Sequence, residues 1–149
     1  MAMNQALKGR TYEPVVYTVE RERVTAFADA IGEDGAIYHD PEAARAAGFA
    51  EQVAPPTFVT VMNISISGQA VMDPELGLDY SRVVHGEMEY EGRRPVVVGE
   101  TLTATPRIAD IYARGPNEFL VIEADIADAQ GETVVRSRSV LLSRGTAER

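Results

Sequence analysis

Cysteine is absent from the 149-residue chain, and histidine occurs only twice. Without cysteine the chain can form no disulfide, offer no thiolate nucleophile and build no cysteine-ligated zinc site. Two histidines are also too few for most transition-metal sites that are held by protein ligands alone. We therefore expect no bound metal and no resident cofactor.

Long apolar runs and an excess of positive charge are also missing. No apolar run approaches the roughly 20 residues that a membrane-spanning helix needs, and the opening MAMNQALKGR contains no signal-peptide core. Acidic residues outnumber basic residues by 23 to 14, which gives a formal net charge of −9. Long-range repulsion of nucleic acid and anionic membranes follows. We expect a cytoplasmic protein that binds neither.

What remains is the composition of an ordinary globular protein, with 45% hydrophobic and 25% charged residues. The length suits one domain with one core, so we predict a single domain over residues 1–149.

Helical patterns dominate the first half of the chain. A helix is predicted from Thr18, as N-cap, to Ile31, because apolar residues recur on one face and Gly32 follows. A short helix is predicted between Asp40-Pro41 and Gly48.

A third helix is predicted over residues 55–72, although its many β-branched residues make a strand a rival by propensity. Its length favours a helix. Because it is apolar on nearly every side, we expect it to be buried.

The second half reads as strands. Turn residues separate four runs with strand character, RVVHGEMEYEG, ETLTATPRIADIYA, NEFLVIEADIADA and ETVVRSRSVLLSR. Their short connections require largely antiparallel pairing. A buried helix followed by such a sheet indicates an α+β fold, with the sheet curled around the helix.

These elements resemble the hot-dog fold, and within it the MaoC-like (R)-specific enoyl-thioester hydratases and 3-hydroxyacyl dehydratases. The resemblance runs from Tyr17 to Leu142 and is carried by FADAIGEDGAIYHDPEAARAAGF, VAPPTF, VVHGEMEYEGRRPVVVGETL and GETVVRSRSVLL. It is closest to the dehydratase N-terminal type, often the partner subunit or first half of a two-hot-dog enzyme. It implies a homodimer or a heterodimer with a second hot-dog chain, acting on acyl-CoA or acyl-carrier-protein thioesters.

The reaction of that family needs two proton-transfer groups and a donor to the thioester oxygen. The family supplies an Asp and a His from a Gly-Asp-x-Asn-Pro-Ile-His loop. Aligned without a gap, Glu33 replaces that Asp and Tyr38 replaces that His. A second alignment, with one inserted residue, pairs Asp34 with His39 at the family's spacing of five. The resemblance implies these four residues as candidate catalytic groups, and the gapless alignment is the simpler one.

In that family the oxyanion donor is usually the backbone N–H of a Gly that follows a His at the start of the central helix. Here Pro55 and Pro56 occupy that pair, and proline has no N–H to donate. The N–H groups of Thr57 and Phe58 remain at the positive end of the predicted helix, so both are candidate substrate-binding residues. We expect the thioester in a tunnel between this helix start and the Glu33–His39 loop.

Two further residues are candidate substrate contacts. His85 heads a strand with Glu87, Glu89 and Glu91 on its own parity. That row indicates either a solvent face or an interface, while the resemblance places His85 near the thioester channel. Arg93, beside Arg94 in a turn, suits a phosphate of coenzyme A or phosphopantetheine, but also suits plain surface charge.

Simpler interpretations stand beside the catalytic ones. His39 next to Asp40 suits a solvated loop residue or a local cap, Glu33 and Asp34 suit turn acids after a helix, and Tyr38 suits a packed loop tyrosine. Two functions therefore remain open: a hydro-lyase component, or a non-catalytic subunit that binds the acyl chain and completes a partner's active site. A hot-dog thioesterase fits the motifs less well.

Overall fold

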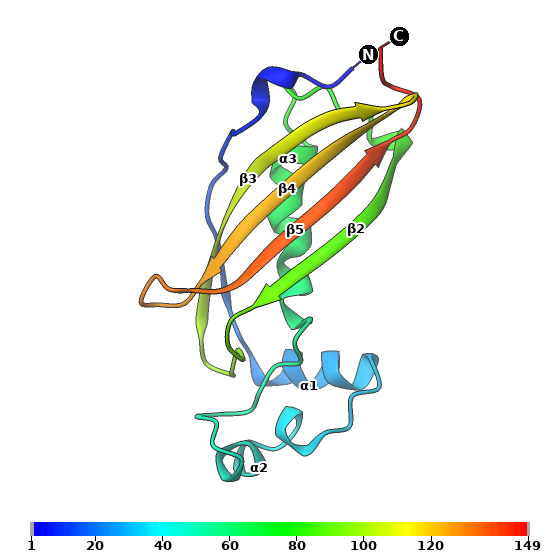
Figure 1. Ribbon diagram of the computed structural model, residues 1–149. Helices are drawn as coiled ribbons and strands as arrows, with labels where there is room; N and C mark the ends of the chain where they lie inside the picture. The colour runs from blue at the N-terminus through cyan, green and yellow to red at the C-terminus, as the bar shows by residue number, and fades with distance from the viewer. Residues whose placement is uncertain (1, 149) are drawn as a thin grey trace.

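The computed structural model describes residues 2–148, and its largest element is a curled five-stranded antiparallel sheet (Figure 1). The strand order is β1-β3-β4-β5-β2, which leaves β2 at one edge. The strands are β1 (Val15–Thr18), β2 (Val83–Gly92), β3 (Thr101–Arg114), β4 (Asn117–Ala127) and β5 (Thr133–Ser143). The four predicted strands are confirmed within two residues at each end.

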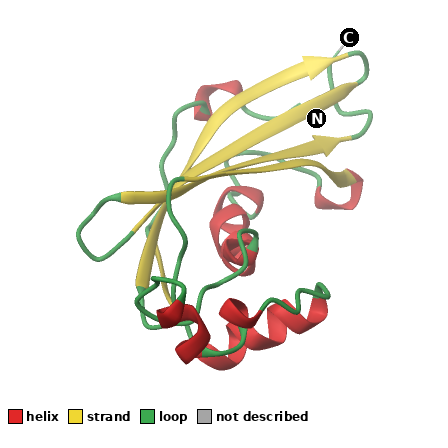
Figure 2. Cartoon of the chain, turned by 60° about the horizontal axis from the view of Figure 1, so that its bottom comes forward, coloured by secondary structure: helices red, strands yellow, loops and turns green. Residues whose placement is uncertain are grey.

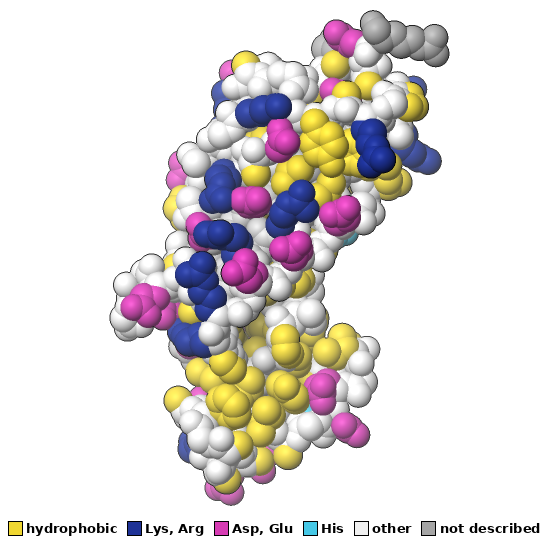
Figure 3. All heavy atoms as spheres, viewed as in Figure 1, with side chains coloured by type: hydrophobic (Ala, Val, Ile, Leu, Met, Phe, Trp, Pro, Cys, Tyr) yellow, Lys and Arg dark blue, Asp and Glu magenta, His cyan; other side chains and the backbone are white. Residues whose placement is uncertain are grey.

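Alternating side chains explain why these segments pair as they do. In β4 the inward residues Leu120, Ile122, Ala124 and Ile126 are fully or almost fully buried, while Glu123 faces the other side. The outer face, turned to the viewer in Figure 3, carries charged side chains of both signs across neighbouring strands. Arg136 pairs there with Asp125 at 2.7 Å between Nε and Oδ1.

The central helix lies along the concave face of the sheet (Figure 2). It begins as a 3₁₀ turn at Phe58–Met62 and continues as α3 (Asn63–Val71). Phe58, Met62, Ile66 and Ala70 follow one another at intervals of four and are all buried against the sheet. The helix and the curled sheet confirm the predicted α+β hot-dog architecture.

Two details of that helix differ from expectation. It begins at Phe58 and not at Pro55, because residues 55–58 form a turn, closed by the Phe58 N–H to Pro55 carbonyl bond, that precedes the first helical residues. Burial on all sides is also wrong for the described chain. The side of the helix turned away from the sheet leaves Ile64 86% exposed, and Met72, just past its end, is 76% exposed.

A smaller layer packs below the end of the sheet, formed by α1 (Arg21–Ala30) and α2 (Pro41–Ala46) (Figure 1). For α2 the predicted cap is confirmed, since Asp40 Oδ1 accepts the N–H of Glu42 at 2.9 Å. The Thr18 cap of α1 is wrong. Thr18 ends β1, which pairs with β3, and the helix starts after Glu20.

The N-terminal segment runs antiparallel alongside β3, to which residues 9–12 are hydrogen-bonded, and is fastened to the end of α3. Asp73, which follows the helix, accepts hydrogen bonds from Tyr12 Oη at 2.8 Å and from Arg10 Nη1 at 2.9 Å. These bonds tie the first residues of the chain to the core element. Within residues 2–148, no helix is long and apolar enough to cross a membrane.

Candidate functional site

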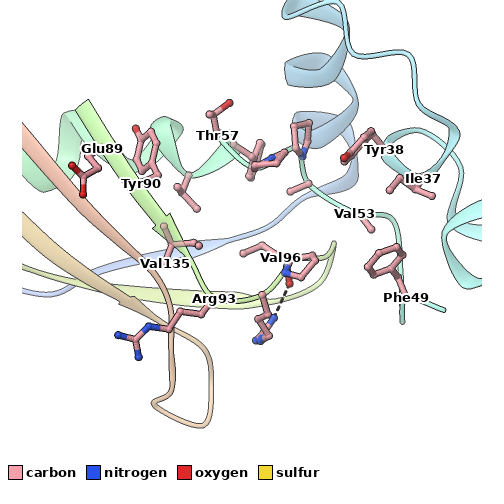
Figure 4. A pocket seen from close by; sticks show the side chains of 18 of the residues that line it. Ile37, Tyr38, Phe49, Val53, Thr57, Glu89, Tyr90, Arg93, Val96 and Val135 are labelled. Carbon is pink, nitrogen blue, oxygen red and sulfur yellow. Dashed lines mark hydrogen bonds between the residues drawn. The ribbon is translucent and has the colours of Figure 1, made fainter. Parts of the chain in front are cut away.

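A pocket of about 710 Å³ lies where the end of the sheet meets the α1–α2 layer (Figure 4). That volume lies within the range of small-molecule sites. One wall comes from the loops around α2, with Ile37, Tyr38, Phe49 and Val53. The opposite wall comes from the ends of the sheet and includes Tyr90, Val96 and Val135. The approach to the central helix, residues 54–59, joins them.

Backbone hydrogen bonds hold these two walls at a fixed spacing. The N–H of Val53 donates to the carbonyl of Ile37 at 3.0 Å, on the side of the α1–α2 layer. The N–H of Ala54 donates to the carbonyl of Val96 at 2.8 Å, on the side of the sheet. The residues just before the central helix therefore form a short extended bridge between the walls.

Most of the lining is apolar, and the few polar groups are spread around it. Tyr38 and Thr57 lie on the side of the helices, and Glu89 and Arg93 lie on β2 and just beyond its end (Figure 4). Figure 3 shows apolar side chains gathered on the surface in this lower part of the molecule. Such a lining suits a flexible apolar ligand attached to a polar head.

The loop from Glu33 to His39 is closed by its own side chains. The carboxylate of Glu33 accepts the N–H of Gly35 at 3.0 Å, and Nε2 of His39 lies 2.7 Å from the carbonyl oxygen of Glu33. The other ring nitrogen, Nδ1, lies 3.8 Å from Asp29 Oδ1. His39 is thus held on both sides by groups of the loop and of α1.

The structure separates the four predicted catalytic residues. Tyr38 lines the pocket, whereas Glu33, Asp34 and His39 are not among its lining residues. Asp34 is exposed. The carboxylates of Asp34 and Glu33 form no hydrogen bond with the His39 imidazole. Glu33 contacts the imidazole only through its backbone carbonyl. Neither of the two predicted pairs, Asp34 with His39 or Glu33 with Tyr38, is therefore assembled by side-chain contact within residues 2–148.

The start of the central helix also lacks part of the expected donor set. Pro55 and Pro56 both line the pocket, and neither carries an N–H. The N–H of Phe58 donates to the carbonyl of Pro55 at 2.8 Å and is therefore in use. Thr57, which is exposed to the pocket, keeps its N–H and hydroxyl without a partner in residues 2–148.

A β-bulge changes the face on which His85 lies. The register of β2 against β5 shifts between His85 and Glu87, so His85 faces inward beside Leu141 while Glu87 pairs with outward-facing Val140. The predicted common parity of His85 with the three glutamates is wrong for this reason. His85 lines a separate groove of about 360 Å³ between α3 and β2, and Nε2 lies 3.2 Å from Ser139 Oγ.

The two turn arginines play different parts. Arg94 binds Glu100 at 2.6 Å and Asp128 at 2.9 Å, and these carboxylates raise its pKa. Arg93 lines the pocket, is exposed, and forms no ion pair with any residue that the structure describes. Only Arg93 is therefore available to an anionic ligand at the pocket.

Several lining residues carried no functional signal in the sequence. Phe49 and Val53 read as ordinary apolar residues, and Glu89 and Tyr90 as members of a strand. Glu89 reaches the pocket from β2, at the free edge of the sheet. In residues 2–148 no cluster of His, Asp and Glu side chains is arranged to hold a metal ion.

Known proteins resemble this chain over nearly its whole length. The family model described as "FAS1-like, dehydratase domain region" matches residues 6–137. A UPF0336 protein of Saccharopolyspora erythraea is 44% identical over 149 residues, which covers 99% of this chain and 96% of that protein.

Solved structures share its fold. The C-terminally truncated HadBC (3R-hydroxyacyl-ACP dehydratase) complex from Mycobacterium tuberculosis contains a chain with 25% identity and a TM-score of 0.82, covering 91% of this chain and 96% of that one. A MaoC-like dehydratase gives a TM-score of 0.86 at 22% identity, covering 94% of this chain and 43% of the other. These likenesses agree with the curled sheet and central helix described above.

Proposed function

The chain belongs to the family of FAS1-like dehydratase domain regions, and we propose that it is a component of a hydratase or dehydratase of enoyl and 3-hydroxyacyl thioesters. The thioester is carried on coenzyme A or on acyl carrier protein. The part of this chain is to bind the acyl group. A second hot-dog chain brings the groups that transfer protons.

The reaction explains why two chains are needed. Water adds across the double bond of an enoyl thioester, so one group takes a proton from water while a proton reaches the α-carbon. Negative charge develops on the thioester oxygen and needs hydrogen-bond donors. In this chain Thr57 is a free donor at the pocket, but the pocket holds no histidine.

The observation that carries the proposal is the lining of the 710 Å³ pocket. Of the four candidate catalytic residues it contains only Tyr38, whose phenol is a poorer proton acceptor than the imidazole that the family uses. Apolar side chains fill most of the remaining wall. The pocket is thus equipped to hold an acyl chain and poorly equipped to move protons.

The exposed surface of α3 and β2 supports a partner on this side of the molecule. Strand β2 is an edge strand with an unpaired row of backbone groups, and Ile64 stands 86% exposed beside it. A second hot-dog chain, as in a homodimer or heterodimer, would extend the sheet and cover this side chain. The HadBC protein that resembles this chain is itself a complex of two named components.

The polar head of the ligand is assigned to the open side of the pocket. Arg93 supplies a free guanidinium for a phosphate of coenzyme A or of the phosphopantetheine arm. Thr57 supplies donors near the thioester oxygen. His85 faces the groove toward the partner and is reached only by a ligand that extends between the two chains.

The test is to measure acyl binding and hydration separately on the purified chain. Decanoyl-CoA titrated by calorimetry should bind, whereas crotonyl-CoA should be hydrated slowly or not at all. Val53→Phe fills the pocket and should weaken decanoyl-CoA binding by about tenfold or more, which is about 1.4 kcal/mol. Val16→Phe is the matched control, because Val16 is 64% exposed on β1 and lies outside the pocket.

Two results would overturn the proposal. Equal binding by the wild type and Val53→Phe would place the acyl chain elsewhere. Rapid hydration by the isolated chain that disappears in His39→Ala would make this chain a complete hydratase, with Asp34 and His39 as its working pair.

A further inference from the structure

Gln52 is the most deeply buried large polar side chain beside the pocket. Its relative exposure is 0%, although it stands next to the exposed α1–α2 layer. An amide removed from water is costly unless its donors and acceptor find partners. A leucine or methionine would fill a similar volume without needing hydrogen-bond partners. An amide at this position therefore indicates that its hydrogen bonds have a structural role.

Every hydrogen-bonding group of the Gln52 side chain is used. Nε2 donates to the carbonyl oxygen of Tyr38 at 2.7 Å and to Thr25 Oγ1 at 2.9 Å. Oε1 accepts from Arg21 Nη1 at 3.2 Å. Both donors and the acceptor of the amide are therefore satisfied. They join α1, which contains Thr25 and Arg21, to the pocket loop at Tyr38.

The backbone of the same residue reaches the opposite wall. The carbonyl of Gln52 accepts the N–H of Val98 at 2.9 Å, in the segment that leads into β3. The next two residues, Val53 and Ala54, form the extended bridge to Ile37 and Val96. Gln52 thus holds the Tyr38 side of the pocket with its side chain and the sheet side with its main chain.

A second layer of ionic contacts fixes this residue in turn. The N–H of Gln52 donates to Glu51 Oε1 at 3.1 Å, and the same carboxylate binds Arg21 at 2.9 Å and Arg45 at 2.7 Å. The hydrogen bond from Gln52, followed by that from Arg21, lowers the pKa of Glu51. Arg21 therefore contacts both Gln52 and Glu51, and the three side chains form one connected network.

We propose that Gln52 is a positioning residue, which sets the distance between Tyr38 and the sheet and so the width of the acyl pocket. The inference rests on the proposed function and adds to it the residue that determines the pocket's shape. It predicts a selective effect. Loss of the Gln52 donors should release the Tyr38 wall and weaken contacts with the acyl chain, while the contacts of the coenzyme A head remain.

The experiment compares Gln52→Met with Gln69→Met. Both remove an amide that bridges two segments, but Gln69 lies on α3 and bonds Glu13, away from the pocket. Gln52→Glu is the second variant, since it keeps the acceptor for Arg21 and removes both N–H donors if Gln52→Met does not fold. Thr25→Val removes one partner only and leaves the bond to Tyr38.

Three measurements are made on each protein: affinity for decanoyl-CoA, affinity for coenzyme A itself, and hydrogen exchange of the amides in residues 33–39. In the Gln52 variants, decanoyl-CoA should bind about tenfold more weakly, or about 1.4 kcal/mol. Coenzyme A should bind as in the wild type, and exchange should accelerate in residues 33–39. Gln69→Met and Thr25→Val should bind decanoyl-CoA within about threefold of the wild type.

Unchanged decanoyl-CoA affinity and exchange in the Gln52 variants would overturn the inference. Equal losses for decanoyl-CoA and coenzyme A would overturn it too, because they would indicate general damage to the fold. A wild type that does not bind decanoyl-CoA refutes the proposed function instead. In that case the exchange of residues 33–39 still decides whether Gln52 positions the loop.

Discussion

Nε2 of His39 lies 2.7 Å from the carbonyl oxygen of Glu33, so the imidazole closes the loop in which both residues stand. A carbonyl oxygen can only accept a hydrogen bond, so Nε2 carries a proton in this contact. Nδ1, the other ring nitrogen, lies 3.8 Å from Asp29 Oδ1, and His39 is not among the residues that line the pocket. The next residue back, Tyr38, faces the pocket instead. His39 thus stabilises the loop, and Tyr38 lines the pocket.

His39→Ala should therefore lower stability more than it changes any reaction. Loss of one hydrogen bond in a partly buried loop costs about 1 kcal/mol. Chemical denaturation should show that loss, while the slow hydration of crotonyl-CoA and the affinity for decanoyl-CoA stay near their wild-type values. Tyr38→Phe is the comparison, since it alters the pocket and leaves the loop bond intact. A stability equal to that of the wild type would contradict this account.

Asp73 should make the fastening of the N-terminal segment sensitive to acid. Desolvation favours its neutral form, but hydrogen bonds from the Glu75 N–H, Tyr12 and Arg10 outweigh it, and the pKa of Asp73 is lowered. A carboxyl with a lowered folded-state pKa stabilises the fold above its unfolded pKa of about 3.9. That contribution disappears as the pH falls through the folded-state value.

The measurement is the melting temperature of the wild type and of Asp73→Asn from pH 7 down to pH 3. The variant should melt lower at neutral pH, and the difference should shrink as Asp73 of the wild type takes up its proton. Asp34→Asn, at an exposed residue of the pocket loop, is the control and should show little difference at any pH. A gap between the wild type and Asp73→Asn that is constant with pH would argue against an ionised Asp73 as the cause.

Ile64→Lys should weaken association with a second hot-dog chain. The side chain is 86% exposed and borders the groove between α3 and β2, and a charge buried there by a partner would be unpaired. Co-expression with a hot-dog chain that carries an intact Gly-Asp-x-Asn-Pro-x-His loop, followed by sedimentation, measures the complex. Met72→Lys, at the exposed end of the same helix, should leave the complex intact. Equal complex formation by Ile64→Lys would move the interface elsewhere.

Arg93→Gln should weaken binding of acyl-CoA but not of the phosphate-free acyl-pantetheine. A free guanidinium near a phosphate contributes a charge-assisted hydrogen bond of about 1.5–3 kcal/mol, so the affinity for acyl-CoA should fall at least about tenfold. Calorimetry with both thioesters gives the comparison, and Arg114→Gln, at the far end of β3, is the control. Equal losses for the two ligands would show that Arg93 does not contact phosphate.

The strands and the two small helices could be predicted because their signals are local. Alternation in β4 and turn residues at each end fix where a strand begins and ends, and Asp40-Pro41 specifies a helix start by its own chemistry. The central helix was recognised from its length. The exposed side of this helix could not be predicted. Ile64 has the same apolar side chain whether it is exposed to solvent or buried by another chain.

Features that depend on distant partners could not be predicted. Strand β1 has four residues and forms through its pairing with β3, a partner that the local pattern around Thr18 does not reveal. The bulge at Gly86 depends on β5, where the carbonyl of Val140 lies 3.3 Å from the place a side chain would occupy. It reverses the face of His85.

The family motifs predict the location of the candidate site but only part of its composition. The loop at Tyr38 and the segment at Pro55, which precedes the central helix, both line one pocket, as the resemblance implied. The sequence alone does not show which of the neighbouring residues Arg93 and Arg94 forms ion pairs. The carboxylates that bind Arg94 belong to Glu100 and Asp128, which are distant in the sequence. The part played by Gln52 depends on Thr25, Tyr38 and Val98, which are remote in sequence.

The glutamates of β2 bear on self-recognition. Glu87, Glu89 and Glu91 are exposed on the outer face along the free edge of the sheet. If two copies joined edge to edge, their glutamate rows would meet on the same face of the joined sheet, where like charges repel, and each copy already carries a net charge of −9. An edge with lysines or arginines would be attracted instead. The glutamate row therefore works against edge-to-edge pairing of identical copies, and Arg138, whose Nη1 lies 3.4 Å from Glu87 Oε2, offsets part of that repulsion.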